Sequence, residues 1–228
     1  MTQVLWCAGG SVSLPQDRAE FPAASLAWVT AAGIQPEWID EIHWLTGGSR
    51  AGPAPRWPAK LSAFTWADLP LLDHALLHAA SHAILSGERG LVLLGEEEED
   101  LVHLLVLCSE EAAATRGLTP SASLPARFSI TESGGPGSLP ADLQRQLQQA
   151  NLSSSGASLL AACDDAGRMP GYLPAGWRSL EGDNSGCAVG LCNRLVDALR
   201  AGGGDLGLLV SLAAQGPGMV TVVERWQG

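Results

Sequence analysis

The sequence predicts an α/β protein built from two similar halves. Each half shows the same order of expected elements: strand, helix, strand, loop, helix, strand, strand. Residues 77–95 and 191–210 also match each other, because each segment reads as a helix, a glycine stop and an apolar strand. A chain of 228 residues is long enough to bury a sizeable core. We therefore expect one compact domain of two halves, residues 1–120 and 121–228, with sheets and helices stacked in layers.

The first half contains the clearest elements. Its expected strands are Gln3–Ala8, Glu41–Thr46, Gly90–Gly95 and His103–Cys108, and its expected helices are Pro22–Ala32, Ala59–Trp66 and Leu71–Ser86. Gly33 and Gly87 follow two of these helices and are placed to end them. The first strand, helix and strand favour a parallel pair of strands joined by a right-handed crossover.

The second half is expected to begin after a linker at Glu110–Pro125, which ends in a Ser/Pro-rich stretch. Asp164–Asn184 is expected to be rich in loops. The expected strands are Arg127–Thr131, Ser158–Cys163 and two apolar strands after Gly204, and the expected helices are Leu139–Ala150 and Gly186–Arg200.

Composition disfavours several functional classes. The net charge is −11 and no basic stripe is visible, so we expect neither a nucleic-acid partner nor an anionic membrane partner. No apolar run approaches the roughly 18–20 residues of a membrane span, and no basic region precedes the apolar N-terminal residues as in a secretory signal. Five scattered cysteines without a C-x-x-C pair favour reduced thiols over a disulfide framework. Together these features predict a cytoplasmic protein.

Three segments resemble the thiolase superfamily. Gly33–Leu45 is similar to the family's first helix end and second strand, commonly Gly-Ile-x-Pro-x-x-Ile/Val-Asp-x-Ile/Val. Ala79–Gly95 resembles the helix and strand after the nucleophile, and Gly182–Arg225 resembles the closing helix and final hairpin. The resemblance implies duplicated thiolase-like halves, layered α-β-α-β-α with two mixed five-stranded sheets. It also implies a short member that lacks the loop domain catalytic thiolases insert after the first half.

The positions that carry thiolase chemistry are altered in this chain. By resemblance, the nucleophilic cysteine maps near Pro70, the histidine of the Gly-His-Pro-x-Gly turn maps to Asp183, and the second cysteine maps to Ala213. Proline and alanine offer no nucleophile. An aspartate replaces an imidazole donor at neutral pH only if its pKa is strongly raised. The resemblance therefore implies a catalytically degenerate member that does not perform Claisen condensation with these residues.

Other side chains could carry a relocated activity. His74, His78 and His82 are spaced four apart, with Asp73 beside His74. On a helix they would share one face, either as a metal or proton-relay site or as an ordinary polar face. Cys187 lies near the start of the last helix, where a cysteine is either an activated thiol or simply a small buried residue.

Two acidic features complete the candidates. Asp183 or the pair Asp164-Asp165 could act with a histidine as acid and base. The run Glu96–Asp100 is expected to be a solvated turn or surface, with a basic partner as the alternative.

These observations leave two main functional hypotheses. The first is a non-catalytic subunit, or a binder of an acyl-CoA-like or carrier-bound group, with no cofactor and no metal. By resemblance it would dimerise through the sheet of the first half, with itself or with a thiolase-fold partner. The second is an active acyltransferase or hydrolase that uses relocated residues, namely Cys187, Asp183 or His74. A structural module without a ligand is a third hypothesis.

Overall fold

The structure is a computed structural model of the 228-residue chain. It describes residues 3–13, 17–46, 55–66, 72–98, 100–130, 139–149, 159–163, 177–180, 187–211 and 218–226. The chain divides into two compact units, Met1–Ser121 and Ala122–Gly228. Among the described residues, no helix combines the length and the apolar character needed to cross a lipid bilayer.

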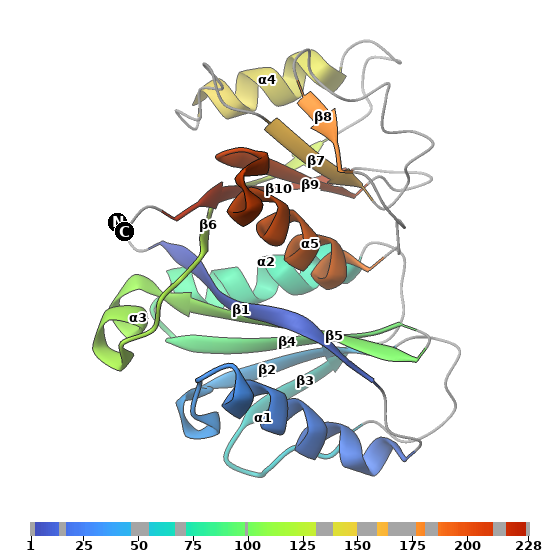
Figure 1. Ribbon diagram of the computed structural model, residues 1–228, viewed down its shortest axis with the longest axis vertical. Coiled ribbons are helices and arrows are strands. Elements are labelled where there is room, and N and C mark those ends of the chain that lie inside the picture. The colour runs from blue at the N-terminus through green and yellow to red at the C-terminus, as the bar shows by residue number, and fades with distance from the viewer. Residues whose placement is uncertain are drawn as a thin grey trace. The chain divides into compact units, whose positions relative to one another are not determined.

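The first unit is built on a five-stranded mixed sheet. Its elements are β1 (Val4–Ser13), η1 (Arg18–Glu20), α1 (Phe21–Ala31), η2 (Pro36–Trp38), β2 (Glu41–Leu45), β3 (Ser62–Trp66), α2 (Leu72–Leu85), β4 (Leu91–Glu98), β5 (Leu101–Ser109) and α3 (Glu110–Arg116). The strands lie in the order β3-β2-β4-β5-β1. β2 pairs in parallel with β3 and β4, whereas β5 runs antiparallel to β4 and β1. Helices α1 and α2 lie on opposite faces of this sheet (Figure 1).

The strand directions distinguish the two ends of this sheet. Because β1 and β4 both run antiparallel to β5, the strands β1, β2, β3 and β4 all finish at the same end, which we call the carboxyl end of the sheet. The same strands begin at the opposite end, which we call the amino end. In parallel α/β sheets, binding and catalytic groups gather beyond the carboxyl ends of the strands.

The second unit repeats the arrangement of the first. Its elements are β6 (Ala122–Ile130), α4 (Leu139–Gln149), β7 (Leu159–Cys163), β8 (Trp177–Ser179), α5 (Ala188–Ala198), η4 (Leu199–Gly203), β9 (Leu206–Ser211) and β10 (Gly218–Arg225). The strands lie in the order β8-β7-β9-β10-β6, with α4 and α5 on opposite faces (Figure 1). β7 pairs in parallel with β8 and β9, and β10 runs antiparallel to β9 and β6. The predicted duplication is therefore confirmed, although each unit contains one strand, β3 or β8, that the sequence did not predict.

Burial explains why the central strands carry continuous apolar runs. Leu91–Leu94 on β4 and Leu104–Cys108 on β5 are almost completely inaccessible to solvent. Helices cover the sheet on both sides, so neither face of these strands needs polar residues. The predicted strand after Gly90 is thus confirmed, and it continues beyond Gly95 to Glu98.

The helix predicted at Ala59–Trp66 is wrong, because Ser62–Trp66 forms β3. β3 pairs in parallel with β2 over its whole length, from Ser62 opposite Glu41 to Trp66 opposite Leu45. The aromatic and β-branched residues of this strand suit a pleated surface better than a helix. Likewise, β8 lies within Asp164–Asn184, which was expected to be loop-rich.

The predicted linker Glu110–Pro125 does contain the boundary between the two units, but most of it is folded into α3 and the start of β6. Ser109 Oγ accepts a hydrogen bond from the Ala112 backbone N–H at 3.1 Å and caps α3. Gly117, with a φ of 64°, takes the left-handed conformation that ends this helix. β6 then begins at Ala122. Residues 110–121, all of them described, therefore contain no inserted domain between β5 and β6.

The expectation of reduced thiols is wrong for one pair of cysteines. Cys7 and Cys108 form a disulfide, with their Cα atoms 6.5 Å apart. They come from neighbouring strands, β1 and β5, whose register shifts between Trp6 and Ala8. A pairing across 101 residues of sequence depends on strand order, which the spacing of the cysteines did not reveal.

Candidate functional site

The three positions that map to thiolase chemistry, Pro70, Asp183 and Ala213, lie outside the described residues. The pair Asp164-Asp165 also lies outside them. In chain order, Pro70 precedes α2 and Asp183 precedes α5, as the resemblance implies. His74 belongs to α2, but its side chain is not among the described ones.

Cys187 is the one relocated candidate whose surroundings are described. It occupies the N-cap of α5, and its Sγ accepts a hydrogen bond from the Gly190 backbone N–H at 3.3 Å. The residue is only 4% exposed. Further along the same helix, burial raises the pKa of the Cys192 thiol to about 12, so that side chain stays protonated. These contacts give Cys187 a capping role in the helix.

The two described histidines of α2 face different surroundings. His78 is half-buried, whereas His82, one turn later, is exposed. Histidines that bind one ion must direct their ring nitrogens to a common point. The spacing of four residues therefore does not by itself place this pair in one environment.

The acidic run is the expected solvated turn only at its end, where Asp100 is exposed, and not at its start. Glu96 and Glu97 lie on β4 and are only 4% and 6% exposed. The Nε1–H of Trp44, which is completely buried, donates a hydrogen bond to Glu97 Oε1 at 2.7 Å. The run reads as polar in sequence, but strand geometry turns part of it into the core, where a buried carboxylate needs such a donor.

Three polar side chains form a hydrogen-bonded array at the carboxyl end of the first sheet. Ser11 on β1 lies directly opposite His103 on β5, and its Oγ is 2.8 Å from His103 Nδ1. His103 Nε2 is 2.8 Å from Glu98 Oε2, at the end of β4. Ser11 is exposed, whereas the His103 side chain is only 13% exposed and that of Glu98 is 30% exposed. We call these residues the Ser–His–Glu array.

A second polar network lies on β2. Glu41 Oε1 is 2.6 Å from His43 Nε2, and Glu41 Oε2 accepts a hydrogen bond from Arg89 Nε at 2.6 Å. The Trp66 Nε1–H, which can only donate, lies 3.3 Å from His43 Nδ1. Nδ1 must therefore be the acceptor, and the proton sits on Nε2 facing Glu41. We call these four residues the β2 network.

Burial sets the charge state of this imidazole. His43 is 4% exposed, and burial lowers its pKa below the usual 6.5. The hydrogen bond and negative charge of Glu41 oppose that shift without reversing it. His43 is therefore neutral at neutral pH, and Glu41 is balanced chiefly by Arg89. The rings of Phe64 and Trp66 on β3 stack on the imidazole, with centroids 5.3 Å and 5.9 Å away.

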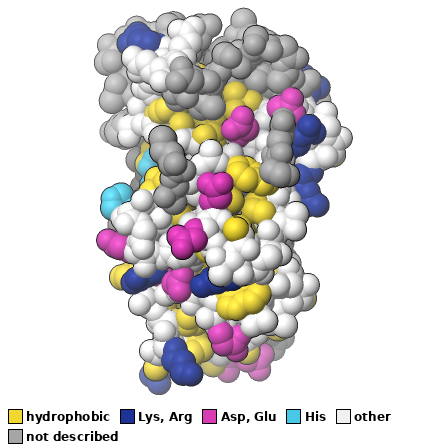
Figure 2. Space-filling view, turned by 90° about the vertical axis from the view of Figure 1, so that its left-hand side faces the viewer, with side chains coloured by type: hydrophobic (Ala, Val, Ile, Leu, Met, Phe, Trp, Pro, Cys, Tyr) yellow, Lys and Arg dark blue, Asp and Glu magenta, His cyan; other side chains and the backbone are white. Residues whose placement is uncertain are grey.

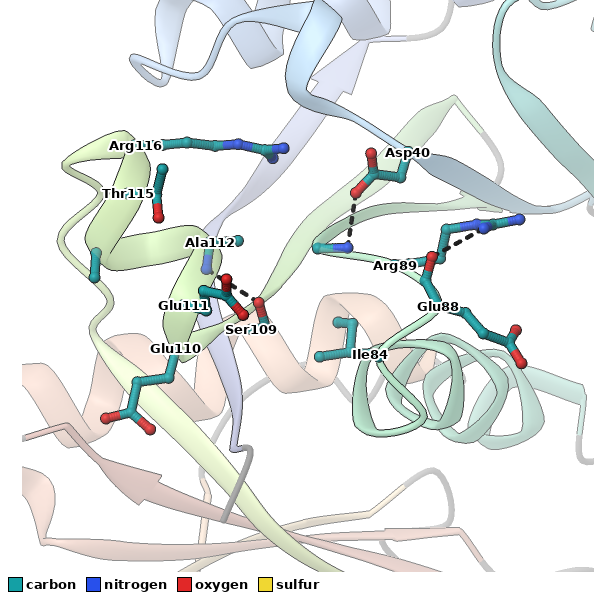
Figure 3. A pocket seen from close by; sticks show the side chains of 13 residues that line it. Asp40, Ile84, Glu88, Arg89, Ser109, Glu110, Glu111, Ala112, Thr115 and Arg116 are labelled. Carbon is teal, nitrogen blue, oxygen red and sulfur yellow. Dashed lines mark hydrogen bonds between the residues drawn. The ribbon is translucent and has the colours of Figure 1, made fainter.

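A cavity of about 780 Å³ opens at the amino end of the first sheet, between the end of α2 and α3 (Figure 3). Asp40 points to the start of β4, where its Oδ2 accepts hydrogen bonds from the backbone N–H groups of Gly90 at 2.7 Å and Leu91 at 2.9 Å. Arg116 donates to the Trp38 carbonyl at 2.7 Å and lies over the Trp38 ring. These charged groups hold the fold together, and they explain the Asp of the Gly33–Leu45 motif as a link between two strands.

On the face shown in Figure 2, acidic and basic side chains lie interspersed among apolar ones. The basic side chains of the described residues form no continuous stripe on that face.

Sequence reasoning missed both polar groupings, because each depends on strand pairing. Glu41 and His43 are two residues apart on one strand and therefore share one of its faces, so their spacing could have indicated that they are neighbours. Ser11 and His103 are separated by 92 positions, so only the register of β1 and β5 brings them together.

Comparison with known proteins supports the fold but gives no information about the chemistry of the site. No protein-family model and no curated protein matches the sequence. Among solved structures, the chain is similar to the acetyl-CoA acetyltransferase of Bacillus anthracis, with a TM-score of 0.72 and 14% sequence identity. The match covers 99% of this chain and 99% of that chain. Together with the repeated unit and its strand order, this likeness shows that the chain has a thiolase-like fold.

Proposed function

We propose that the protein is a thiolase-fold subunit that does not carry out condensation at the family's usual positions and that forms a dimer through β3. The observation that supports the dimer is the exposure of β3 at the edge of the sheet. β3 lies at the edge of the first sheet, and Ser62, Ala63, Phe64 and Thr65 are all exposed. The altered residues Pro70, Asp183 and Ala213 support the loss of condensation chemistry.

An exposed edge strand offers backbone N–H and C=O groups to a further strand. Proteins that stay monomeric usually block such an edge with lysine, proline or a bulge. The sequence of β3, Ser-Ala-Phe-Thr-Trp, contains no charge and no proline. Phe64 is 49% exposed, although its ring stacks on the buried His43. A second copy of the same strand would cover this ring and pair with the backbone, and a thiolase-fold partner could use the same edge.

The dimer is testable by light scattering coupled to size exclusion. We expect the wild type to elute at twice the chain mass of 23.7 kDa. Phe64→Lys should elute as a monomer, because it places a charge in the centre of the proposed contact. Leu85→Lys, on α2, is the matched control, because Leu85 is similarly exposed at 46%. A monomeric wild type, or equal behaviour of the two variants, would contradict the dimer.

We further propose that the subunit binds an acyl-CoA or an acyl group on a carrier. The support is the fold shared with an acetyl-CoA acetyltransferase. Binding to the native state should raise the midpoint of thermal unfolding, because a ligand at 100 times its Kd stabilises by about 2.7 kcal/mol. The measurement is a thermal shift series with CoA and acetyl-CoA, with adenosine diphosphate as a control for the nucleotide part. No shift at millimolar concentrations would overturn the ligand proposal and leave the dimer proposal standing.

A further inference from the structure

We propose that the Ser–His–Glu array of the first unit is a nucleophilic site, in which Ser11 accepts an acyl group from an activated ester or thioester. This inference goes beyond the proposed subunit role and does not depend on it. It uses none of the positions at which thiolases carry out condensation.

Backbone pairing fixes the array. Ser11 and His103 face each other across the antiparallel β1–β5 pair, and Glu96 faces His103 across the β4–β5 pair. Glu98 lies two residues beyond Glu96 on the same face, so its side chain reaches His103 diagonally. All three residues therefore project from paired strands, which hold side chains more rigidly than loops do.

The proton positions follow from the partners. A carboxylate can only accept, so the 2.8 Å contact to Glu98 places the ring proton of neutral His103 on Nε2. Nδ1 is then an unprotonated base, 2.8 Å from the Ser11 hydroxyl. A hydroxyl, an imidazole base and an orienting carboxylate are the parts that activate serine for acyl transfer. Here Nδ1 faces the serine and Nε2 faces the acid.

The reaction balances with groups that are present. Ser11 Oγ attacks the acyl carbon while His103 Nδ1 takes the hydroxyl proton, and Glu98 stabilises the resulting imidazolium. The leaving alkoxide or thiolate departs with that proton, which gives an acyl ester on Ser11 and a free alcohol or thiol. Water then attacks the ester with the same base, releases the carboxylic acid and restores the hydroxyl.

Exposure is consistent with these roles. Ser11 is open to solvent and can meet a substrate, whereas the side chain of its base is largely shielded. Ser13 provides an internal comparison, since it is also exposed and lies two residues further along β1. Its cross-strand partner is Leu101, which offers no base.

The test is covalent labelling of the full chain with a fluorophosphonate, followed by intact-mass and peptide analysis. Ser11 Oγ should displace fluoride from phosphorus and carry one phosphonyl group. Ser11→Ala should abolish the adduct, whereas Ser13→Ala should label like the wild type. His103→Gln should slow labelling at least about 100-fold, as expected for loss of a general base. Hydrolysis of p-nitrophenyl acetate should fall in the same order.

Each alternative outcome overturns the proposal. A wild type that remains unlabelled means that the contacts are ordinary hydrogen bonds between strands, as does an adduct that persists in Ser11→Ala. Labelling that is equally fast in His103→Gln means that Ser11 is not activated. Circular dichroism of every variant separates these results from unfolding.

Discussion

Replacement of Gly95 by alanine is expected to destabilise the first unit more than any other single methyl addition on its sheet. A Cβ at this position would lie inside the van der Waals contact of Trp44 Cε3 and Cζ3. Trp44 cannot move aside readily, because it is completely buried and its Nε1–H is bonded to Glu97. Its ring also packs against Phe21 and Trp57, with centroids 6.3 Å and 5.1 Å away.

Overpacking of a core with little room to relax costs about 3 kcal/mol, at the upper end of the usual range. The measurement is guanidinium-induced unfolding followed by circular dichroism. Gly10→Ala is the matched control, because its added Cβ would meet Trp28 Nε1 at 3.0 Å, and Trp28 is only half-buried and can turn away. Equal unfolding midpoints for the two variants would show that Trp44 does not depend on the absence of a side chain at Gly95.

Truncation of Glu41 to alanine is expected to have the second largest effect. Glu41 is 6% exposed and accepts from two side chains of the β2 network, His43 and Arg89. Its removal leaves Arg89 without its carboxylate partner and His43 Nε2–H without an acceptor. Breaking a buried ion pair from one side typically costs about 3–5 kcal/mol, and we expect the lower end because the Arg89 side chain is 32% exposed.

The same unfolding measurement tests the role of Glu41. Glu37→Ala is the control, because this glutamate lies nearby on η2 and is exposed. We expect the Glu37 variant to unfold within about 0.5 kcal/mol of the wild type, as surface substitutions usually do. If Glu41→Ala also stays in that range, the network contributes no net stability, and β2 and β3 are held by backbone pairing and ring stacking alone.

The two predictions depend on different parts of one strand. Trp44 points to one face of β2, toward Gly95, while Glu41 and His43 share the other. β2 is therefore buried on both faces, with Ile42 and Trp44 on one face and Glu41, His43 and Leu45 on the other. The proposed dimer strand β3 pairs directly with it, so a defect in the β2 network should also weaken the edge at which dimerisation is proposed.

The order of elements could be predicted from the sequence because it is encoded locally. Apolar runs such as Leu91–Leu94, and glycines at helix ends such as Gly87, identify strands and stops without knowledge of the rest of the chain. The match between residues 77–95 and 191–210 was enough to predict a duplicated unit. β3 was mistaken for a helix because an exposed edge strand carries no apolar alternation that distinguishes it.

The sequence alone determined the repeated α/β unit. It also showed that Pro70, Asp183 and Ala213 stand at the positions that map to thiolase chemistry. Only the tertiary structure decided which distant side chains meet, because hydrogen bonds and disulfides depend on strand register. It joined Cys7 to Cys108 and placed Ser11 against His103, pairings that span 101 and 92 positions. It also placed Glu96 and Glu97, which look like a surface run in the sequence, in the core, because both faces of β4 are covered at these two positions.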